Sequence, residues 1–155
     1  MYAHVIFSGP ARRMQLWYKQ DENSTAELRH TFEAHDVGVN DGTLPDEYGH
    51  KCKCPPGTFL VGKPQHLNPP ERPYGYFFTP LSDETSDGPM EEHGRDGIGV
   101  HGGGSDLPDP FADRQGWEWT FGCLRLQNED NKTFVSFVEY VQSFGGKVEI
   151  TVDWT

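Results

Sequence analysis

The sequence has no run of about 18 consecutive apolar residues, and this absence excludes a membrane-spanning helix of ordinary length. Residues 1–8 lack a charged start followed by an apolar core, so no cleaved signal peptide is expected. Basic residues are also scarce: 13 Lys and Arg stand against 24 Asp and Glu, for a net charge of −11. Because no basic stripe is present to neutralise phosphates, binding to nucleic acid or to an anionic membrane surface is not expected.

Cysteine is rare as well. Only three copies occur, Cys52, Cys54 and Cys123, and an odd number excludes a complete set of disulfides. The segment His50–Cys54 places a histidine and two thiols at alternate positions, and His66 lies downstream. Zinc sites usually separate paired cysteines by about two to four residues, so we favour a solvent-facing loop with two thiols, or a local disulfide, over a metal site.

Glycine and proline are abundant, with 18 and 12 copies among 155 residues, and they are accompanied by 10 Phe, 6 Tyr and 4 Trp. This composition favours a turn-rich β protein over a helical bundle. The length fits one domain over residues 1–155. Short β-rich or alternating segments predict strands over residues 4–7, 14–18, 28–33, 58–61, 74–78 and 147–154. Loops are expected over residues 36–56 and 81–97.

One helix is predicted, over Glu129–Phe144. Its apolar side chains recur at the spacing of a single helix face, at Phe134, Phe137, Val138 and Val141. Asn128 is expected to cap the start, and Gly145 is expected to end it. A mainly β chain with one late helix is not a βαβ series, so a parallel nucleotide-binding sheet is not expected.

The stretch Ile98–Leu126 carries the residues with the clearest chemical potential. His101-Gly102 is followed 22 positions later by Cys123, which lies inside the run Thr120–Leu126. A thiol becomes a good nucleophile when a neighbouring base removes its proton, and histidine is the usual base. Glycine lets the backbone approach a reacting carbonyl and frees N–H groups to face it. The residue types alone also allow a structural cysteine and a histidine with satisfied hydrogen bonds.

The two motifs in this stretch, His-Gly and Thr-x-Gly-Cys-Leu-Arg-Leu, closely resemble the signature of the L,D-transpeptidase catalytic domain, the YkuD family. Pro55–Phe59 is similar to the Pro-x-Gly-x-Phe hairpin found upstream in that family, and the order of elements matches. The resemblance implies a mainly β fold, specifically a β-sandwich with one late amphipathic helix. It also implies that residues 1–155 form a single catalytic domain.

The resemblance implies a cysteine-dependent enzyme that acts on the peptide stems of peptidoglycan and needs no cofactor or metal. Cys123 is expected to attack the carbonyl that follows an L-configured centre, His101 to take the thiol proton, and the Gly102 carbonyl to orient the imidazole. The N–H groups of Gly122 and Cys123 are expected to receive the oxyanion. The further residues expected to contact the oxyanion or the substrate are Thr120, Trp119 and Arg125.

Four of the surrounding side chains leave alternatives open. Arg125 shares a strand face with Cys123, where it could bind a substrate carboxylate or form a structural ion pair. Many family members have a second histidine directly before Gly-Cys, and this chain has Phe121 there, which removes a polar contact. Trp117 and Trp119 either line a groove together or anchor the core and the loop.

The fate of the acyl-enzyme is also left open. An amine from a second stem would give a cross-link, whereas water would give L,D-carboxypeptidase or endopeptidase activity. Action in the periplasm or cell wall without a leader implies delivery by a phage, by a secretion system or from a trimmed precursor, and the first two favour a cell-wall-degrading hydrolase. The rivals are a non-catalytic peptidoglycan-binding module and, with poor spacing, a zinc enzyme using His93, His101 and Cys123. The sequence does not determine the oligomeric state.

Overall fold

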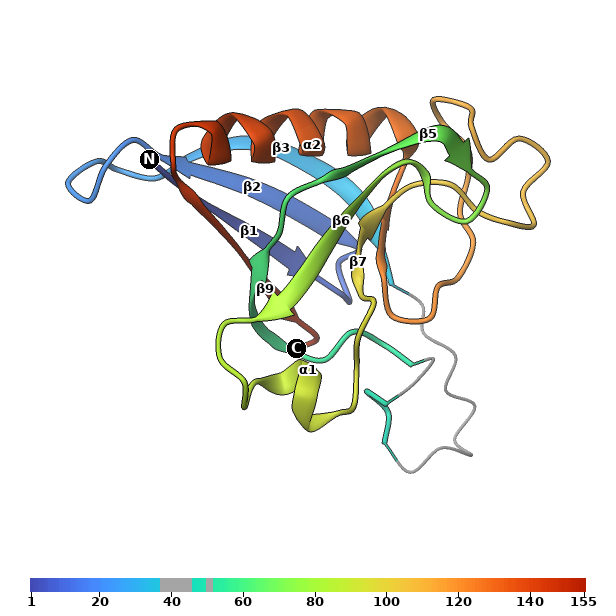
Figure 1. Ribbon diagram of the computed structural model, residues 1–155, viewed down its shortest axis with the longest axis horizontal. Coiled ribbons are helices and arrows are strands. Elements are labelled where there is room, and N and C mark those ends of the chain that lie inside the picture. The colour runs from blue at the N-terminus through green and yellow to red at the C-terminus, as the bar shows by residue number, and fades with distance from the viewer. Residues whose placement is uncertain (37–45, 50–51) are drawn as a thin grey trace.

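The computed structural model describes residues 1–36, 46–49 and 52–155, which form a strongly curved sheet with two helices (Figure 1). The strands are β1 (Tyr2–Ser8), β2 (Arg13–Lys19), β3 (Glu27–His35), β4 (Gly57–Val61), β5 (Gln65–Glu71), β6 (Gly75–Asp83), β7 (Gly99–His101), β8 (Leu124–Leu126) and β9 (Lys147–Asp153). The helices are α1 (Pro89–Glu92) and α2 (Asn128–Ser143).

The strands form one sheet in the order β4-β9-β1-β2-β3-β8-β7-β6-β5. An additional pairing of β4 with β6 joins the two ends, so the sheet closes into a barrel-like arrangement with β5 outside the ring. The mainly β prediction is confirmed. The finer prediction of a β-sandwich is not confirmed, because the β4–β6 pairing closes the sheet on itself.

Strict alternation of apolar side chains builds the interior of the ring. In β1, β2 and β9 every second residue is buried, as expected for strands with one face on the core. The inward residues of these strands are Ala3, Val5, Phe7, Met14, Leu16, Tyr18, Val148, Ile150 and Val152. Trp154, beyond the end of β9, meets Phe7 edge to face at 5.6 Å between ring centroids.

Helix α2 runs along one side of the sheet (Figure 1) and buries Phe134, Val138 and Val141, as its sequence pattern predicts. Its first turn contains Glu129 and Asp130, whose negative charges interact favourably with the positive end of the helix dipole. The predicted cap is wrong: Gln127 occupies the N-cap position without a side-chain hydrogen bond, and Asn128 is already helical. The Asn128 side chain instead forms hydrogen bonds with the backbone of the preceding loop.

Other differences concern elements with weak sequence signals. β5 lies outside the predicted strands, and β6 continues into the predicted loop 81–97, which also contains α1. Cys52 and Cys54 are fully buried, so the solvent-facing loop expected for them is wrong, and Cys54 carries a free thiol, so no disulfide joins them. His50 lies outside the described residues. Within the described ranges, no helix is long and apolar enough to cross a membrane.

Candidate active site

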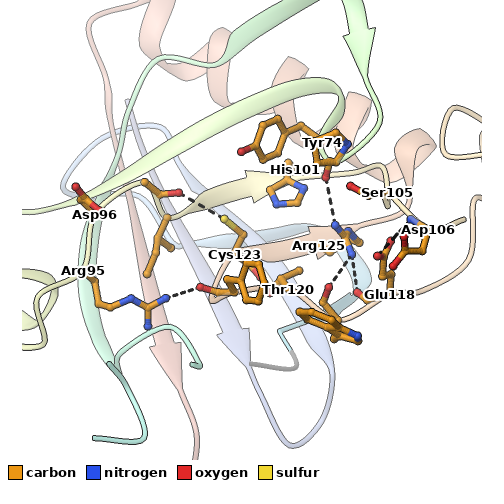
Figure 2. Close-up of a pocket in the computed structure, with 15 residues that line it drawn as sticks. Tyr74, Arg95, Asp96, His101, Ser105, Asp106, Glu118, Thr120, Cys123 and Arg125 are labelled. Carbon is orange, nitrogen blue, oxygen red and sulfur yellow. Dashed lines mark hydrogen bonds between the residues drawn. The ribbon is translucent and has the colours of Figure 1, made fainter. Parts of the chain in front are cut away.

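A cavity of about 490 Å³ opens beside the short strands β7 and β8 (Figure 2). Five of the seven site residues predicted from the sequence line it, and one of these is Thr120, which is 5% exposed. The other four are Trp119, Cys123, His101 and Arg125. Gly102 and Gly122 are buried next to these residues in the sequence.

Parallel pairing of β7 with β8 brings the two motifs together. Val100 pairs with Leu124 and His101 pairs with Arg125 in this register. The close approach of β7 to β6 requires Gly99, because a Cβ there would lie 2.5 Å from the Thr79 carbonyl oxygen. The 22-residue separation in sequence is therefore closed by adjacent strands of one sheet.

His101 is held in one tautomer and one orientation. Its Nδ1 lies 2.7 Å from the Gly102 carbonyl oxygen, which can only accept, so Nδ1 carries the proton and Nε2 keeps its lone pair. The rings of Tyr74 and Phe78 pack against the imidazole with centroids at 5.0 and 5.9 Å. Burial, followed by the charge of Arg125, lowers the pKa of His101 to about 3, so the ring is neutral at neutral pH.

Cys123 precedes β8 and is partly exposed to the cavity. Its thiol donates to the Gly97 carbonyl oxygen with an Sγ–O distance of 3.6 Å. Burial raises the pKa of the Cys123 thiol to about 11, and a hydrogen bond with the Gly99 backbone opposes that rise only in part. The resting site therefore combines a neutral thiol with a neutral imidazole.

Arg125 is 4% exposed, and its guanidinium bonds to backbone carbonyls (Figure 2). The acceptors are the carbonyl oxygens of Gly102 at 3.3 Å, Glu118 at 2.6 Å, Trp119 at 3.4 Å and Pro73 at 3.2 Å. The Gly102 oxygen also binds His101 Nδ1, so Arg125 helps to fix the acceptor that orients the imidazole. The observed contacts are thus neither the predicted ion pair nor an open fork for a substrate carboxylate.

The segment before Cys123 is tightly folded on itself. The Gly122 N–H donates to Thr120 Oγ1 at 3.2 Å, and the Thr120 hydroxyl donates to the Cys123 carbonyl oxygen at 2.7 Å. Arg95 holds the Phe121 carbonyl from the other side. Of the two N–H groups expected to receive an oxyanion, the one on Gly122 is therefore already engaged within the protein.

Substitution of Gly122 by alanine is expected to lower the free energy of unfolding by about 3 kcal/mol. Gly122 has φ +111°, and a Cβ there would lie 2.2 Å from Arg95 Nη2 and 2.8 Å from the Cys52 carbonyl oxygen. Urea denaturation gives the measurement. Gly145→Ala is the matched control: its φ is +77°, a methyl group added there would meet nothing within 4 Å, and we expect about 1–2 kcal/mol. Equal losses in the two variants would show that the close contacts do not matter.

The aromatic residues near the cysteine divide into two groups. Trp119 and Phe121 are 49% and 52% exposed at the cavity, with ring centroids 5.0 Å apart and edge to face. Trp117 instead stacks on the His35 ring at 3.9 Å and anchors its loop there. Of the two tryptophans, Trp119 therefore lines the cavity and Trp117 does not. Phe121, at the position where many family members have a second histidine, lines it as well.

Buried amide side chains hold the connection between the two motifs. Asn128 accepts from the Gly103 N–H at 2.9 Å and donates to the Pro110 and Ala112 carbonyl oxygens, both at 2.7 Å. Gln115 donates to the Gly103 carbonyl at 3.2 Å. These contacts explain why Asn128 does not cap the helix, and they fix the backbone that follows His101.

Several contributors were not identified from the sequence. Arg95 and Asp36 lie in or beside segments predicted to be loops, and nothing local marks them as buried. The zinc alternative finds no support: His93 bonds to Asp46 at 2.7 Å, and the described part of the chain contains no group of three or more His, Cys, Asp or Glu placed to hold a metal ion.

The closed sheet, with His101 on β7 and Cys123 directly before the adjacent strand β8, is consistent with an L,D-transpeptidase catalytic domain. The model of that family, YkuD, matches residues 3–150, and this chain belongs to the family. No curated protein sequence matches the chain significantly.

Several solved structures share the fold, including the following two. The helical cell shape determining protein Pgp2 from Campylobacter jejuni has a TM-score of 0.65 at 17% identity over 99% of this chain. Bd1075 from Bdellovibrio bacteriovorus has a TM-score of 0.63 at 12% identity over 96% of this chain. This chain spans less than half the length of either, 48% and 46% respectively.

Proposed function

We propose that this protein is a cysteine-dependent L,D-transpeptidase or L,D-carboxypeptidase that acts on peptidoglycan stem peptides through an acyl-enzyme on Cys123. The observation that carries the proposal is the shared cavity of Cys123 and His101, in which the Gly102 carbonyl fixes the imidazole with Nε2 unprotonated. A nucleophile and an oriented base in one concave site meet the requirements for acyl transfer.

In the first half-reaction Cys123 Sγ attacks the carbonyl carbon after the L-configured centre while His101 Nε2 takes the thiol proton. The resulting tetrahedral oxyanion collapses, the C–N bond breaks, and the imidazolium returns its proton to the departing amine of the D-residue. The product is a thioester on Cys123. Both groups start neutral, so proton transfer and C–S bond formation are coupled rather than preceded by a stable thiolate.

In the second half-reaction an amine of another stem or a water molecule attacks the thioester. His101 accepts the proton of the attacking group, the C–S bond breaks, and the thiol is restored. A second cavity of about 430 Å³ shares the wall Arg95–Ile98 with the first and offers room for an acceptor chain. Trp119 and Phe121 form the apolar side of the donor cavity, where they can cover the stem peptide.

The Cys123 N–H would receive the oxyanion, while the Gly122 N–H stays hydrogen-bonded to Thr120 and helps to hold the segment that presents the cysteine. Arg125 acts as a positioning residue in this scheme, because it holds the same Gly102 oxygen as His101. We place the reaction in one catalytic domain, residues 1–155, that acts in the periplasm or cell wall without a cofactor.

The test is product analysis by mass spectrometry after incubation with muropeptides that carry tetrapeptide stems. Loss of the terminal D-residue identifies carboxypeptidase activity, and a new dimer identifies transpeptidation; either result supports the proposal. The matched control is protein first alkylated at Cys123, which is partly exposed while Cys52 and Cys54 are buried. Unchanged muropeptides, or products that persist after selective alkylation, would contradict the proposal.

A further inference from the structure

A buried carboxyl group that does not itself line the cavity contacts the cysteine motif. Asp36 directly follows β3 and is 5% exposed. Its Oδ2 accepts from the Cys54 N–H at 2.7 Å, and its Oδ1 lies 3.4 Å from Thr120 Oγ1. Asp36 thus bridges the backbone of the Cys54 segment and the hydroxyl group that organises residues 120–123.

The hydrogen-bonding capacity of Thr120 limits how these groups can be arranged. A hydroxyl has one proton to give and two lone pairs. The Thr120 proton goes to the Cys123 carbonyl at 2.7 Å, and one lone pair accepts from the Gly122 N–H at 3.2 Å. A neutral Asp36 can donate its own proton to the remaining lone pair, which satisfies every group. An ionised Asp36 has no proton to give, and it competes with the Cys123 carbonyl for the proton of Thr120.

We propose that Asp36 is a positioning residue whose protonated carboxyl group, acting through the Thr120 hydroxyl, fixes the Gly122 and Cys123 peptide units that present the nucleophile. The role in turnover rests on the proposed function, whereas the effect on the thiol of Cys123 does not. Ionisation of Asp36 loosens this arrangement and adds negative charge near the sulfur. The site is therefore most competent while Asp36 keeps its proton.

The charged and titratable groups that face Asp36 are Arg95, Lys53, Cys54 and Cys123. Burial raises the pKa of Asp36 to about 7, although the Cys54 hydrogen bond and the positive charge of Arg95 act in the opposite direction. The negative charge of Asp36 in turn raises the pKa of the Cys123 thiol. Protonation of Asp36 thus changes in the neutral range.

The linkage to folding has a definite sign. The folded-state pKa of Asp36 is higher than its usual value of 3.8, so the folded state holds the proton more tightly than the unfolded state. Its contribution to stability is complete at low pH and is lost as pH rises from about 4 to about 7. Asp36→Asn carries no charge, so its stability relative to the original protein should increase over that interval.

Asp36→Asn is the central variant, because an amide can accept from the Cys54 N–H and donate to Thr120 like the neutral acid. We expect its muropeptide turnover to equal that of the original protein near pH 6 and to exceed it by about two- to tenfold near pH 8.5. Asp36→Leu cannot form either bond, and its turnover should fall about ten- to a hundredfold at both pH values.

A second pair of variants keeps the proposal testable if Asp36→Leu does not fold. Thr120→Val is nearly isosteric but has no hydroxyl, and we expect about a ten- to hundredfold loss of turnover. Thr120→Ser restores the hydroxyl and should restore turnover to within about threefold of the original protein. The proposal would be overturned if Thr120→Val were as active as the original protein, or if Thr120→Ser were as inactive as Thr120→Val.

The rate of Cys123 alkylation by iodoacetamide, followed by peptide mass spectrometry, gives a readout that needs no substrate. The ratio of the Asp36→Asn rate to the original rate should rise from about one near pH 6 to several-fold near pH 8.5. Cys52 and Cys54 are buried, so their alkylation would report unfolding instead. A ratio independent of pH overturns the Asp36 proposal even if turnover is observed; a rising ratio without turnover contradicts only the proposed function.

Discussion

Replacement of Cys123 by alanine is expected to abolish the covalent adduct with stem peptides and to lower their turnover by about a thousandfold or more. Among the described residues, its side chain provides the only sulfur that lines the cavity, because Cys52 and Cys54 are buried elsewhere. Without it, water would have to attack the amide directly while the oriented imidazole faces an empty position. Intact-protein mass spectrometry measures the adduct, and chromatography of muropeptides measures turnover.

Cys123→Ser is the matched variant for this prediction. Serine is similar in size to cysteine and still has a proton to donate to the Gly97 carbonyl. Its hydroxyl is a far weaker nucleophile than the thiol, and the site offers no stronger base to activate it. We expect it to fold with an unchanged melting temperature and to remain close to the alanine variant in turnover. Substantial turnover by Cys123→Ala would assign the chemistry to another group and contradict the mechanism.

The second large effect is expected at His101. In His101→Gln the side chain can still donate to the Gly102 carbonyl but provides no base, so turnover should fall about a thousandfold. Alkylation of Cys123 at alkaline pH should persist, because hydroxide can remove the thiol proton. A variant that loses both turnover and alkylation would indicate a collapsed site rather than a missing base, and a circular dichroism melt separates these cases.

The same residue gives a pH prediction with a definite sign. The pKa of His101 is lowered to about 3, so turnover should show no loss attributable to imidazole protonation between about pH 7 and about pH 5. A fall in turnover centred near the ordinary histidine pKa of 6.5 would contradict it. Because the folded-state pKa is depressed, stability should decrease as pH falls from about 6.5 towards about 3, and His101→Gln should lose less stability over that range.

Local pattern in the sequence predicted the strands whose side chains alternate cleanly. β1, β2 and β9 bury every second residue, and the signal for each is contained within the strand. β5 was missed because Gln65–Glu71 contains two prolines and few buried residues, so its place depends on pairing with β6. Ring closure by β4 and β6 is likewise a long-range pairing that no local pattern encodes.

The pairing of His101 and Cys123 in one cavity could be predicted from the motifs, because a family signature reports the result of a long-range contact. The contacts that surround this pair could not be predicted from the sequence. Arg125 was expected to meet a carboxylate, yet its bonds go to carbonyl groups contributed by residues far apart in sequence. Asp36 precedes a segment rich in glycine, proline and acids, where a solvated aspartate is the ordinary outcome. Burial of these charges depends on the assembled fold.

The two buried arginines beside the cysteine motif, Arg95 and Arg125, donate hydrogen bonds to main-chain carbonyl oxygens. Arg95 bonds to the carbonyls of Tyr48, Cys52, Lys53 and Phe121, and Arg125 to four others. A carbonyl is present whatever the residue type, so the side chains at many of these positions can drift during evolution while the scaffold persists. Trp119 and Phe121 are held in this way by their backbones, so a change of either exposed side chain would leave these carbonyl contacts with the two arginines in place.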